Sequence, residues 1–326
     1  MLSSLSGLAD RNFVVGFLLP TLIAAVLLTW LFQGYAFVAP IWETLRSADG
    51  FASLTLFVLA VWCAAVLLAV FNVQLYRILE GYYGPLSGKR RIERYKRKFA
   101  AEQTRFIALA KDVDEGRYER GRYFGVYAKS QLNYPLKAEY VKPSRFGNIL
   151  SSIETYPLEH YGADGATLWP RLLSVVPESY QRLIDSARAE VDFFVSGLFL
   201  SLLLCCVCLW SFLWSLYADW RDSSGFMWLH LIASIAFALA AVLAYEGALI
   251  RARGWGHAVR SAYDLFLSGL GKQLGYEEPA EAAARKQFWI AFSSMVAYAL
   301  PIDGRYRVAP RLPPASSKPR RSPDTV

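Results

Sequence analysis

The sequence predicts an all-α membrane protein with two transmembrane helical hairpins and a mainly helical cytoplasmic module. Hydrophobic residues make up 55% of the 326 residues, and the mean hydropathy is above zero although long charged stretches dilute it. Four apolar runs are each long enough to cross about 30 Å of hydrocarbon as a helix. These runs are residues 13–32, 51–75, 193–217 and 226–245.

The unequal distribution of basic residues predicts the orientation of these spans. Arg46 is the one basic residue in the short loop at residues 33–50, and Arg221 is the one in the loop at residues 218–225. Residues 89–98, in contrast, are rich in lysine and arginine. Cytoplasmic loops carry the excess of Lys and Arg, so both chain ends and the middle segment are expected in the cytoplasm. The predicted location is the bacterial inner membrane, with a multi-pass topology.

Five segments follow from this reading. They are a first transmembrane hairpin (residues 1–76), a cytoplasmic insert (77–191), a second transmembrane hairpin (192–247), a cytoplasmic helical region (248–309) and a disordered basic tail (310–326). The tail is rich in proline, serine and basic residues, a composition that cannot build a packed core.

The first apolar run is expected to remain in the mature protein as a span. It is longer than the apolar core of a signal peptide, and no clear small-residue cleavage site follows it. Gly16 and Pro20 lie within it, and proline removes one backbone donor from a helix. We therefore expect this helix to bend or to lean on a neighbouring helix.

A fifth apolar stretch, residues 288–302, is not expected to span. It is short for a membrane helix, and Ser293 and Ser294 lie in its middle. A span here would also carry the basic C-terminal residues across the membrane, against the orientation rule. The sequence predicts a buried or interfacial helix that Pro301 closes.

Within the insert, residues 89–113 are predicted to form an amphipathic helix. Apolar residues such as Tyr95, Phe99 and Phe106 recur at spacings near three and four. The polar face begins with basic residues that are expected to attract anionic lipid headgroups. Nucleic acid is not an expected partner, because no recognised reader motif accompanies them. The basic residues are Lys89, Arg90, Arg91, Arg94, Lys96, Arg97 and Lys98.

Residues 116–146 lose the helical periodicity and are rich in tyrosine, arginine and glycine. Such a mixture can stack on bases or bind phosphates, but it is also typical of short strands or loops packed beside a helix. The second interpretation is the expected one, since no known nucleic-acid pattern is present.

Two long helices are predicted to connect the cytoplasmic module rigidly to the membrane. Pro177 starts the first, and nothing breaks it before about Tyr217. The second continues the fourth span through residues 251–270, where Gly254 and Gly256 could bend it.

No catalytic, metal or cofactor site is predicted. The four cysteines lie in the predicted spans, without histidine or carboxylate neighbours that would complete a metal site. Gly269, Gly271 and Lys272 superficially suggest a phosphate loop, but the complete pattern is absent.

Ionisable residues flank the predicted spans rather than occupy them. Asp192 and Glu246 are expected at solvated helix ends, or paired with Arg188 and Arg251. This placement argues against a substrate path through one chain. Small residues on the third span still permit close helix contact, which leaves a pore formed by a homo-oligomer open.

One stretch concentrates turn formers, aromatic residues and charges ahead of the long helix. It reads G-N-x(5)-E-x-Y-P-x(3)-Y-G-x-D-x(4)-W-P-R-L, from Gly147 to Leu172. With later residues such as Asp264 and Trp289, it resembles a group of uncharacterised bacterial multi-pass membrane proteins. The resemblance covers about half the chain and implies a four-span architecture without an assigned activity.

The polar residues of this stretch are the candidate functional cluster: Glu154, His160, Asp164 and Arg171. The carboxylates could transfer protons or hold a cation, and the arginine could pair with an anion. The alternative is structural: Asp164 makes a turn, Arg171 pairs with a carboxylate and Trp169 anchors the segment.

The sequence favours a non-enzymatic scaffold, sensor or effector in the inner membrane. Its module is expected to bind anionic lipid headgroups or a cytoplasmic protein partner. The alternative is an oligomeric channel or transporter, and a membrane-embedded enzyme comes third. No cofactor is expected.

Overall fold

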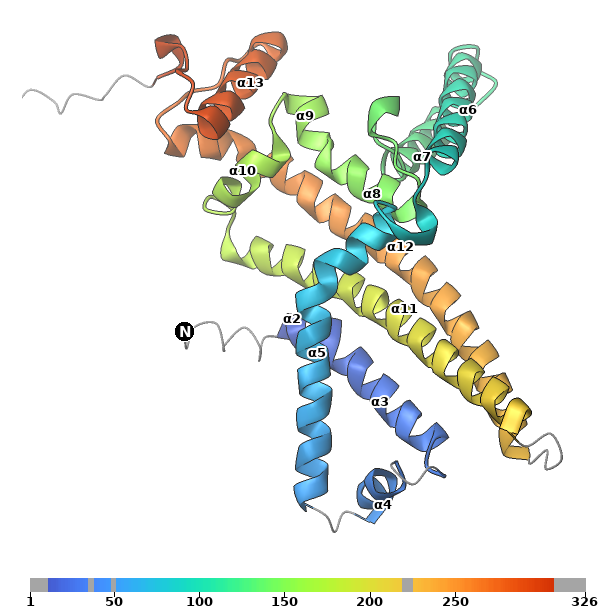
Figure 1. Cartoon of the computed structure of the whole chain (residues 1–326). Helices are drawn as coiled ribbons and strands as arrows, with labels where there is room; N and C mark the ends of the chain where they lie inside the picture. The colour runs from blue at the N-terminus through green and yellow to red at the C-terminus, as the bar shows by residue number, and fades with distance from the viewer. Residues whose placement is uncertain (1–10, 35–37, 48–50, 219–224, 308–326) are drawn as a thin grey trace, which may run out of the picture.

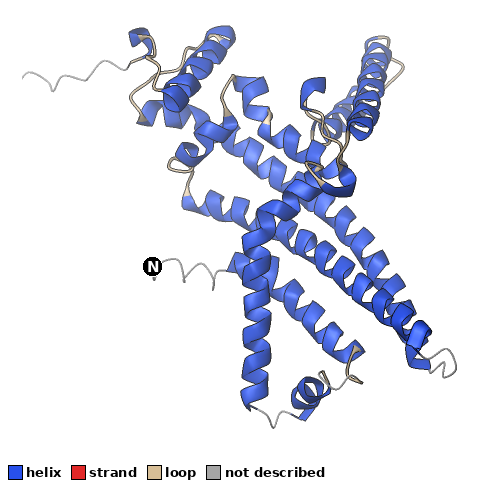
Figure 2. Ribbon diagram, viewed as in Figure 1, coloured by secondary structure: helices blue, strands red, loops and turns tan. Residues whose placement is uncertain are grey.

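The computed structural model describes residues 11–34, 38–47, 51–218 and 225–307, and these residues are almost entirely helical (Figure 2). Among them there is no strand, only an isolated antiparallel bridge between Tyr276 and Arg307. The elements are α2 (Arg11–Phe13), η2 (Val14–Leu18), α3 (Leu19–Leu31), α4 (Ala39–Ser47), α5 (Phe51–Glu80), η3 (Gly84–Leu86), α6 (Lys89–Asp114), α7 (Arg120–Gln131), η4 (Ala138–Tyr140), α8 (Arg145–Glu154), α9 (Tyr156–Tyr161), α10 (Gly165–Leu172), α11 (Glu178–Ala218), α12 (Gly225–Gln273), α13 (Ala282–Tyr298) and η5 (Gly304–Tyr306).

Four helical segments are long and apolar enough to cross a membrane. They are Arg11–Leu31, Leu54–Leu86, Glu178–Tyr217 and Trp228–Gln273, and each overlaps most or all of one apolar run predicted from the sequence. The predictions of an almost entirely helical chain and of four helices long and apolar enough to span a membrane are confirmed.

The helices α11 and α12 form a long antiparallel pair (Figure 1). Their contacts run in opposite directions along the two chains: Tyr180 bonds the carbonyl of Ala258, and Arg251 pairs with Glu190. At 41 and 49 residues, these helices are roughly 60 and 70 Å long. The unbroken helix after Pro177 is confirmed.

The helix α12 is unbroken at Gly254 and Gly256, where the sequence indicated a possible bend. A Cβ on Gly256 would approach the side chain of Ile153 to 2.7 Å, so this glycine lets α8 lie against α12. Nothing lies within 4 Å of a Cβ on Gly254. The helix therefore carries the apolar span into the polar half of the molecule without a hinge.

The first helix departs from α geometry where the sequence indicated. Residues Val14–Leu18 form a π-helical turn just before Pro20, which has no N–H to continue the regular ladder. Gly16 in this turn faces α11, where an added Cβ would lie 3.1 Å from the Cβ of Asp192. The expectation that this helix leans on a neighbour is confirmed.

The first helix lies against α11 along its length and also packs on α5 near its start. Phe13 and Phe17 pack with Ala65 of α5, whereas Leu31 packs with Cys208 of α11. The helices α3 and α5 diverge toward α4, as Figure 1 shows. Much of the apolar surface of α5 is exposed, including Leu56 at 67%.

The helices α6 and α7 pair as an arm that projects from the long helices (Figure 1). The helix expected at residues 89–113 is confirmed, with Phe106 buried edge-on against Tyr127. The expectation of strands or loops at residues 116–146 is wrong in part. Aromatic contact with α6 stabilises the helix α7 there, although its own sequence lacks an apolar stripe.

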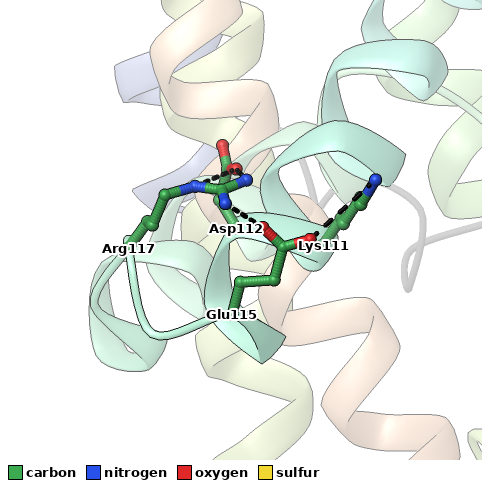
Figure 3. Close-up of polar contacts among 4 residues, drawn as sticks. All are labelled: Lys111, Asp112, Glu115 and Arg117. Atoms are coloured by element: carbon green, nitrogen blue, oxygen red, sulfur yellow. Dashed lines mark hydrogen bonds and ion pairs between the residues drawn. The ribbon is translucent and has the colours of Figure 1, made fainter.

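A cluster of surface ion pairs surrounds the turn between α6 and α7 (Figure 3). Arg117 pairs with Asp112 and Glu115, and Lys111 lies 3.8 Å from the same glutamate. All four side chains are substantially exposed, so these pairs fix the turn while adding little to stability.

The helix α13 confirms the buried interpretation of the fifth apolar stretch. Phe288, Trp289 and Phe292 of α13 are fully buried in the main apolar core. The helix ends at Tyr298, one residue before Ala299 takes a left-handed conformation, so it stops ahead of Pro301. The predicted tail at residues 310–326 lies outside the described residues.

One continuous apolar cluster joins the long helices to the short ones. It extends from Leu79 at the end of α5, through α8 and α10, to Leu249 in α12 and Phe288 in α13. The short helices therefore share their core with the same helices that carry the apolar spans.

Candidate functional site

The first residues of the motif fix α8 against the end of α5. Ser144 caps α8 by accepting a bond from the Gly147 N–H at 2.8 Å, and its hydroxyl donates to the carbonyl of Leu79. A Cβ on Gly147 would lie 2.6 Å from the carbonyl oxygen of Glu80. Only glycine permits this approach of the two backbones.

Asn148 locks the loop that precedes α8. Its Oδ1 accepts from the backbone N–H of Lys142 at 2.8 Å, and its Nδ2 donates to the carbonyls of Lys142 and Ser144. The side chain is 1% exposed and uses both ends of its amide. The Gly-Asn pair is therefore structural.

This docking builds a cavity of about 260 Å³ between α5, α8, α11 and α12. We name it the junction cavity, because it lies where the apolar runs at residues 51–75 and 193–217 meet polar sequence. It is lined by Asn72, Val73, Tyr76, Arg77, Glu80, Leu150, Ile153, Glu154, Arg188 and Trp255.

A buried carboxylate stands behind the wall of the cavity. Asp192 is 6% exposed and accepts hydrogen bonds from Asn72 Nδ2 at 2.9 Å and from the Tyr76 hydroxyl at 2.7 Å. Arg188 Nε lies 4.0 Å from its second oxygen. The expected pairing with Arg188 is confirmed, but the expected solvated position is wrong, because α5 and the first helix cover this face.

The second flanking carboxylate keeps the expected solvated position, with 47% of its side chain exposed, but its partner differs from the expected one. Glu246 pairs with Arg145 at the start of α8, and Arg251 pairs with Glu190 of α11 at 2.9 Å. The predicted pairing of Glu246 with Arg251 is therefore wrong. Each residue instead bonds a different helix, since the face of α12 is shared between α8 and α11.

Two polar groups on the cavity wall have no hydrogen-bond partner among the described residues. They are Asn72 Oδ1 and Trp255 Nε1, and both atoms are buried. The bond from Asn72 Nδ2 to Asp192 fixes the orientation of the amide, which leaves Oδ1 as a buried acceptor without a partner. Leaving a buried polar group unpaired costs about 1–3 kcal/mol.

Glu154 is the one member of the predicted cluster at this cavity. Its side chain is exposed at the edge, and the pKa of its carboxyl is raised by desolvation, which the nearby Lys142 opposes. Glu80, which is 9% exposed, lines the same cavity. Two carboxylates therefore line the junction cavity.

His160 belongs to a separate aromatic cluster between α7, α9 and α12. Its ring lies 4.1 Å from that of Tyr156, whose hydroxyl donates to Asp264 at 2.8 Å. Tyr161 donates to the same oxygen, and Arg260 lies over the Tyr156 ring. Desolvation and the bond to Asp264 raise the pKa of Tyr156 to about 12. These contacts fasten α9 to α12.

Asp164 and Arg171 make local contacts within α10. Asp164 caps the helix by accepting from the N–H of Ala166 and the hydroxyl of Thr167. Arg171 is exposed and donates to the carbonyl of Thr167 at 3.1 Å. No described hydrogen bond or ion pair joins any two of Glu154, His160, Asp164 and Arg171, so the four side chains do not form one site.

The basic cluster on α6 lies on the surface, and each of its side chains is exposed. We name these residues, Lys89, Arg90, Arg91, Arg94, Lys96, Arg97 and Lys98, the α6 basic cluster. None makes an ion pair within the described part of the chain, although Lys98 lies 5.2 Å from the centre of the Tyr95 ring. A cavity lined by Glu80, Lys89 and Ile92 puts the start of α6 beside the end of α5.

Sequence reasoning missed Asn72 and Trp255, which lie in an apolar run and a long helix. A polar amide inside a membrane span is itself a signal, because such groups are usually satisfied by partners or ligands. In the residues that the structure describes, no three His, Cys, Asp or Glu side chains cluster as metal ligands.

Comparisons with known protein families, with curated proteins and with solved structures find no match to this chain. The resemblance to an uncharacterised bacterial membrane group therefore stays a prediction from the motif.

Proposed function

We propose that this chain is a non-enzymatic sensor or effector of the bacterial inner membrane. In this proposal the apolar helices form two transmembrane hairpins, both termini are cytoplasmic, and the short helices form a cytoplasmic module that binds lipid or a protein partner. The low Lys and Arg content of the short loops, against the basic insert, supports this orientation.

The observation that carries the proposal is the continuity of α11 and α12. Each passes unbroken from an apolar span into the core of the module, where Leu249 and Phe288 belong to the same cluster. A stiff helix pair transmits a displacement at one end to the other, since packed elements shift between discrete arrangements. The junction cavity lies where the two halves meet, so occupancy there can bias the module.

The α6 basic cluster supplies the second part of the proposal. Its exposed side chains have no ionic partners within the described chain, and they start beside the end of a proposed span. Each lysine or arginine near an anionic leaflet contributes about 1 kcal/mol of attraction. We propose that the arm rests on the cytoplasmic leaflet and moves when lipid charge or a protein partner changes.

The test measures amide hydrogen exchange of the full chain in nanodiscs of neutral or anionic lipid. Anionic lipid is expected to slow exchange in the first half of α6, and salt is expected to reverse the effect. The double variant Arg94→Gln/Lys98→Gln should lose much of the response, whereas Arg120→Gln/Lys129→Gln, which removes the same charge from α7, should retain it. Exchange in α6 that ignores lipid charge would refute the proposal.

An oligomeric channel or transporter is the second candidate, and buried Asp192 is the observation that favours it. Ionisable residues buried between membrane helices often mark ion or substrate paths. Ion flux into vesicles that contain the parent protein but not into those that contain Asp192→Asn would favour this candidate over the sensor. A homo-oligomer detected by crosslinking would support the same conclusion. Flux equal to that of empty vesicles would remove it.

A further inference from the structure

The junction cavity presents hydrogen-bonding groups that the described protein does not satisfy. Asn72 is 6% exposed, and its Oδ1 is a buried acceptor without a partner, held in place by the bond from Nδ2 to Asp192. This oxygen has almost no accessible surface, whereas Glu80 and Glu154 line the cavity, and their carboxylates have no partner among the described residues. A donor from outside the chain can therefore satisfy the carboxylates.

Acidic and basic side chains occupy different parts of the cavity lining. Glu80, which is 9% exposed, and Glu154 both line the cavity. Neither carboxylate has an ion-pair partner within 4 Å among the described residues. Arg77 and Arg188 line the same cavity from exposed positions, and Arg188 reaches Asp192 only at 4.0 Å. The cavity therefore combines a buried acidic acceptor region with guanidinium groups nearer its edge.

The cavity also lies beside a surface suited to acyl chains. Val73 lines it and is 55% exposed, and Val70, about one turn earlier on α5, is exposed as well. At about 260 Å³ the cavity is smaller than the roughly 300–1,000 Å³ of pockets for drug-sized ligands. A small headgroup fits this volume while its acyl chains stay outside, along α5.

We infer that the junction cavity binds a phospholipid headgroup in which a primary ammonium is joined to a phosphate, the phosphatidylethanolamine class. The ammonium donates hydrogen bonds to the carboxylates of Glu80 and Glu154, while the phosphate meets the guanidinium of Arg188. A choline headgroup has no N–H to donate to these carboxylates, and a glycerol headgroup has no positive charge to pair with them. This inference rests on the proposed membrane function, because it places the cavity at headgroup depth.

The test uses the purified full chain in detergent, titrated with lipids of identical acyl chains and ethanolamine, choline or glycerol headgroups, with bound lipid counted by native mass spectrometry. The ethanolamine lipid is expected to bind about tenfold more tightly than the other two, as one charge-assisted hydrogen bond suggests. Soluble phosphoethanolamine is the second arm. If phosphoethanolamine displaces the lipid at similar concentrations, the cavity binds the free compound as well as the lipid. If it displaces the lipid only weakly, the lipid is the ligand. Both results support the headgroup chemistry.

Two variants keep the inference falsifiable. Glu80→Gln and Glu154→Gln should each lower the preference for the ethanolamine headgroup several-fold, and Glu154 is exposed enough that its replacement leaves the fold intact. Glu139→Gln removes an exposed carboxylate in η4 that does not line the cavity, and it should change nothing. Equal binding of all three lipids, or an unchanged preference in both cavity variants, would overturn the inference.

The two proposals fail separately. Loss of headgroup preference with an intact response of α6 to lipid charge would leave the sensor proposal standing and remove only the cavity ligand. The opposite result would keep the lipid site and remove the role of the arm.

Discussion

The junction cavity and the α6–α7 arm handle charge in opposite ways. At the junction, Asp192 is buried and bonded by Asn72 and Tyr76 from another helix. On the arm, the α6 basic cluster is exposed and lacks ionic partners in the described chain. Fixed, buried groups select a ligand by geometry, whereas exposed cations attract any polyanionic surface and respond to salt. Specificity is therefore expected at the junction, and general membrane attraction on the arm.

The largest expected effect breaks the junction at its closest backbone contact. Gly147→Val places a side chain where a Cβ alone would lie 2.6 Å from the Glu80 carbonyl, a backbone atom that cannot rotate away. We expect a loss of about 3 kcal/mol or more, or no folded protein at all. Thermal unfolding of the purified chain in detergent, with size-exclusion chromatography, measures this.

The matched control lies on the arm. Gly125 is exposed in α7, and nothing lies within 4 Å of an added Cβ. Gly125→Ala should leave stability unchanged or raise it by up to about 1 kcal/mol, since alanine favours a helix. A Gly147→Val protein as stable as Gly125→Ala would show that α8 does not dock as described.

The second prediction removes the buried carboxylate. Asp192→Ala leaves the donors of Asn72 and Tyr76 unpaired, so we expect a loss of about 2 kcal/mol. Glu190→Gln on the same helix weakens only the exposed pair with Arg251 and should cost less than about 1 kcal/mol. Unfolding midpoints of the two variants make the measurement, and equal losses would mean that Asp192 is solvated.

The sequence predicted the elements that depend on local pattern and missed those that depend on distant partners. The apolar stripe after Pro177 was sufficient for α11, and the basic amphipathic pattern was sufficient for α6. The helix α7 has no such stripe. Its stability comes from packing on α6, which the local sequence does not reveal.

The candidate site shows the same division more sharply. The motif drew attention to Gly147 and Glu154, but their partner Glu80 is far away in sequence, so neither docking nor the cavity could be read from spacing. Asp192 likewise follows a polar helix and precedes an apolar run, which indicated a solvated end. Only the packing of α5 and the first helix across it makes the position buried.

The third prediction concerns Asp164, whose exposure is intermediate between that of the buried junction groups and that of the exposed arm. Asp164 is partly exposed and caps α10, so Asp164→Ala should cost about 1 kcal/mol, whereas Asp164→Asn keeps an accepting oxygen and should cost much less. Arg171→Gln, which loses one exposed hydrogen bond, should lie within about 0.5 kcal/mol of the parent. Loss of a cellular activity in Arg171→Gln with unchanged unfolding would instead give this residue a functional role.

The smallest expected change in stability comes from the largest change in charge. Replacing the whole α6 basic cluster by glutamine removes like-charge neighbours at helical spacing, such as Arg90 with Arg94 and Arg94 with Lys98. Each such pair destabilises a helix by about 0.2–0.5 kcal/mol, and glutamine is a good helix former, so the variant should unfold at or slightly above the parent midpoint. The difference should shrink in high salt, because repulsion between exposed charges is screened. A large loss of stability would mean that these cations hold the fold together, and the contrast between arm and junction would fail. An unchanged or raised midpoint would instead show that the fold does not need these cations, as the proposed attraction to an anionic surface predicts.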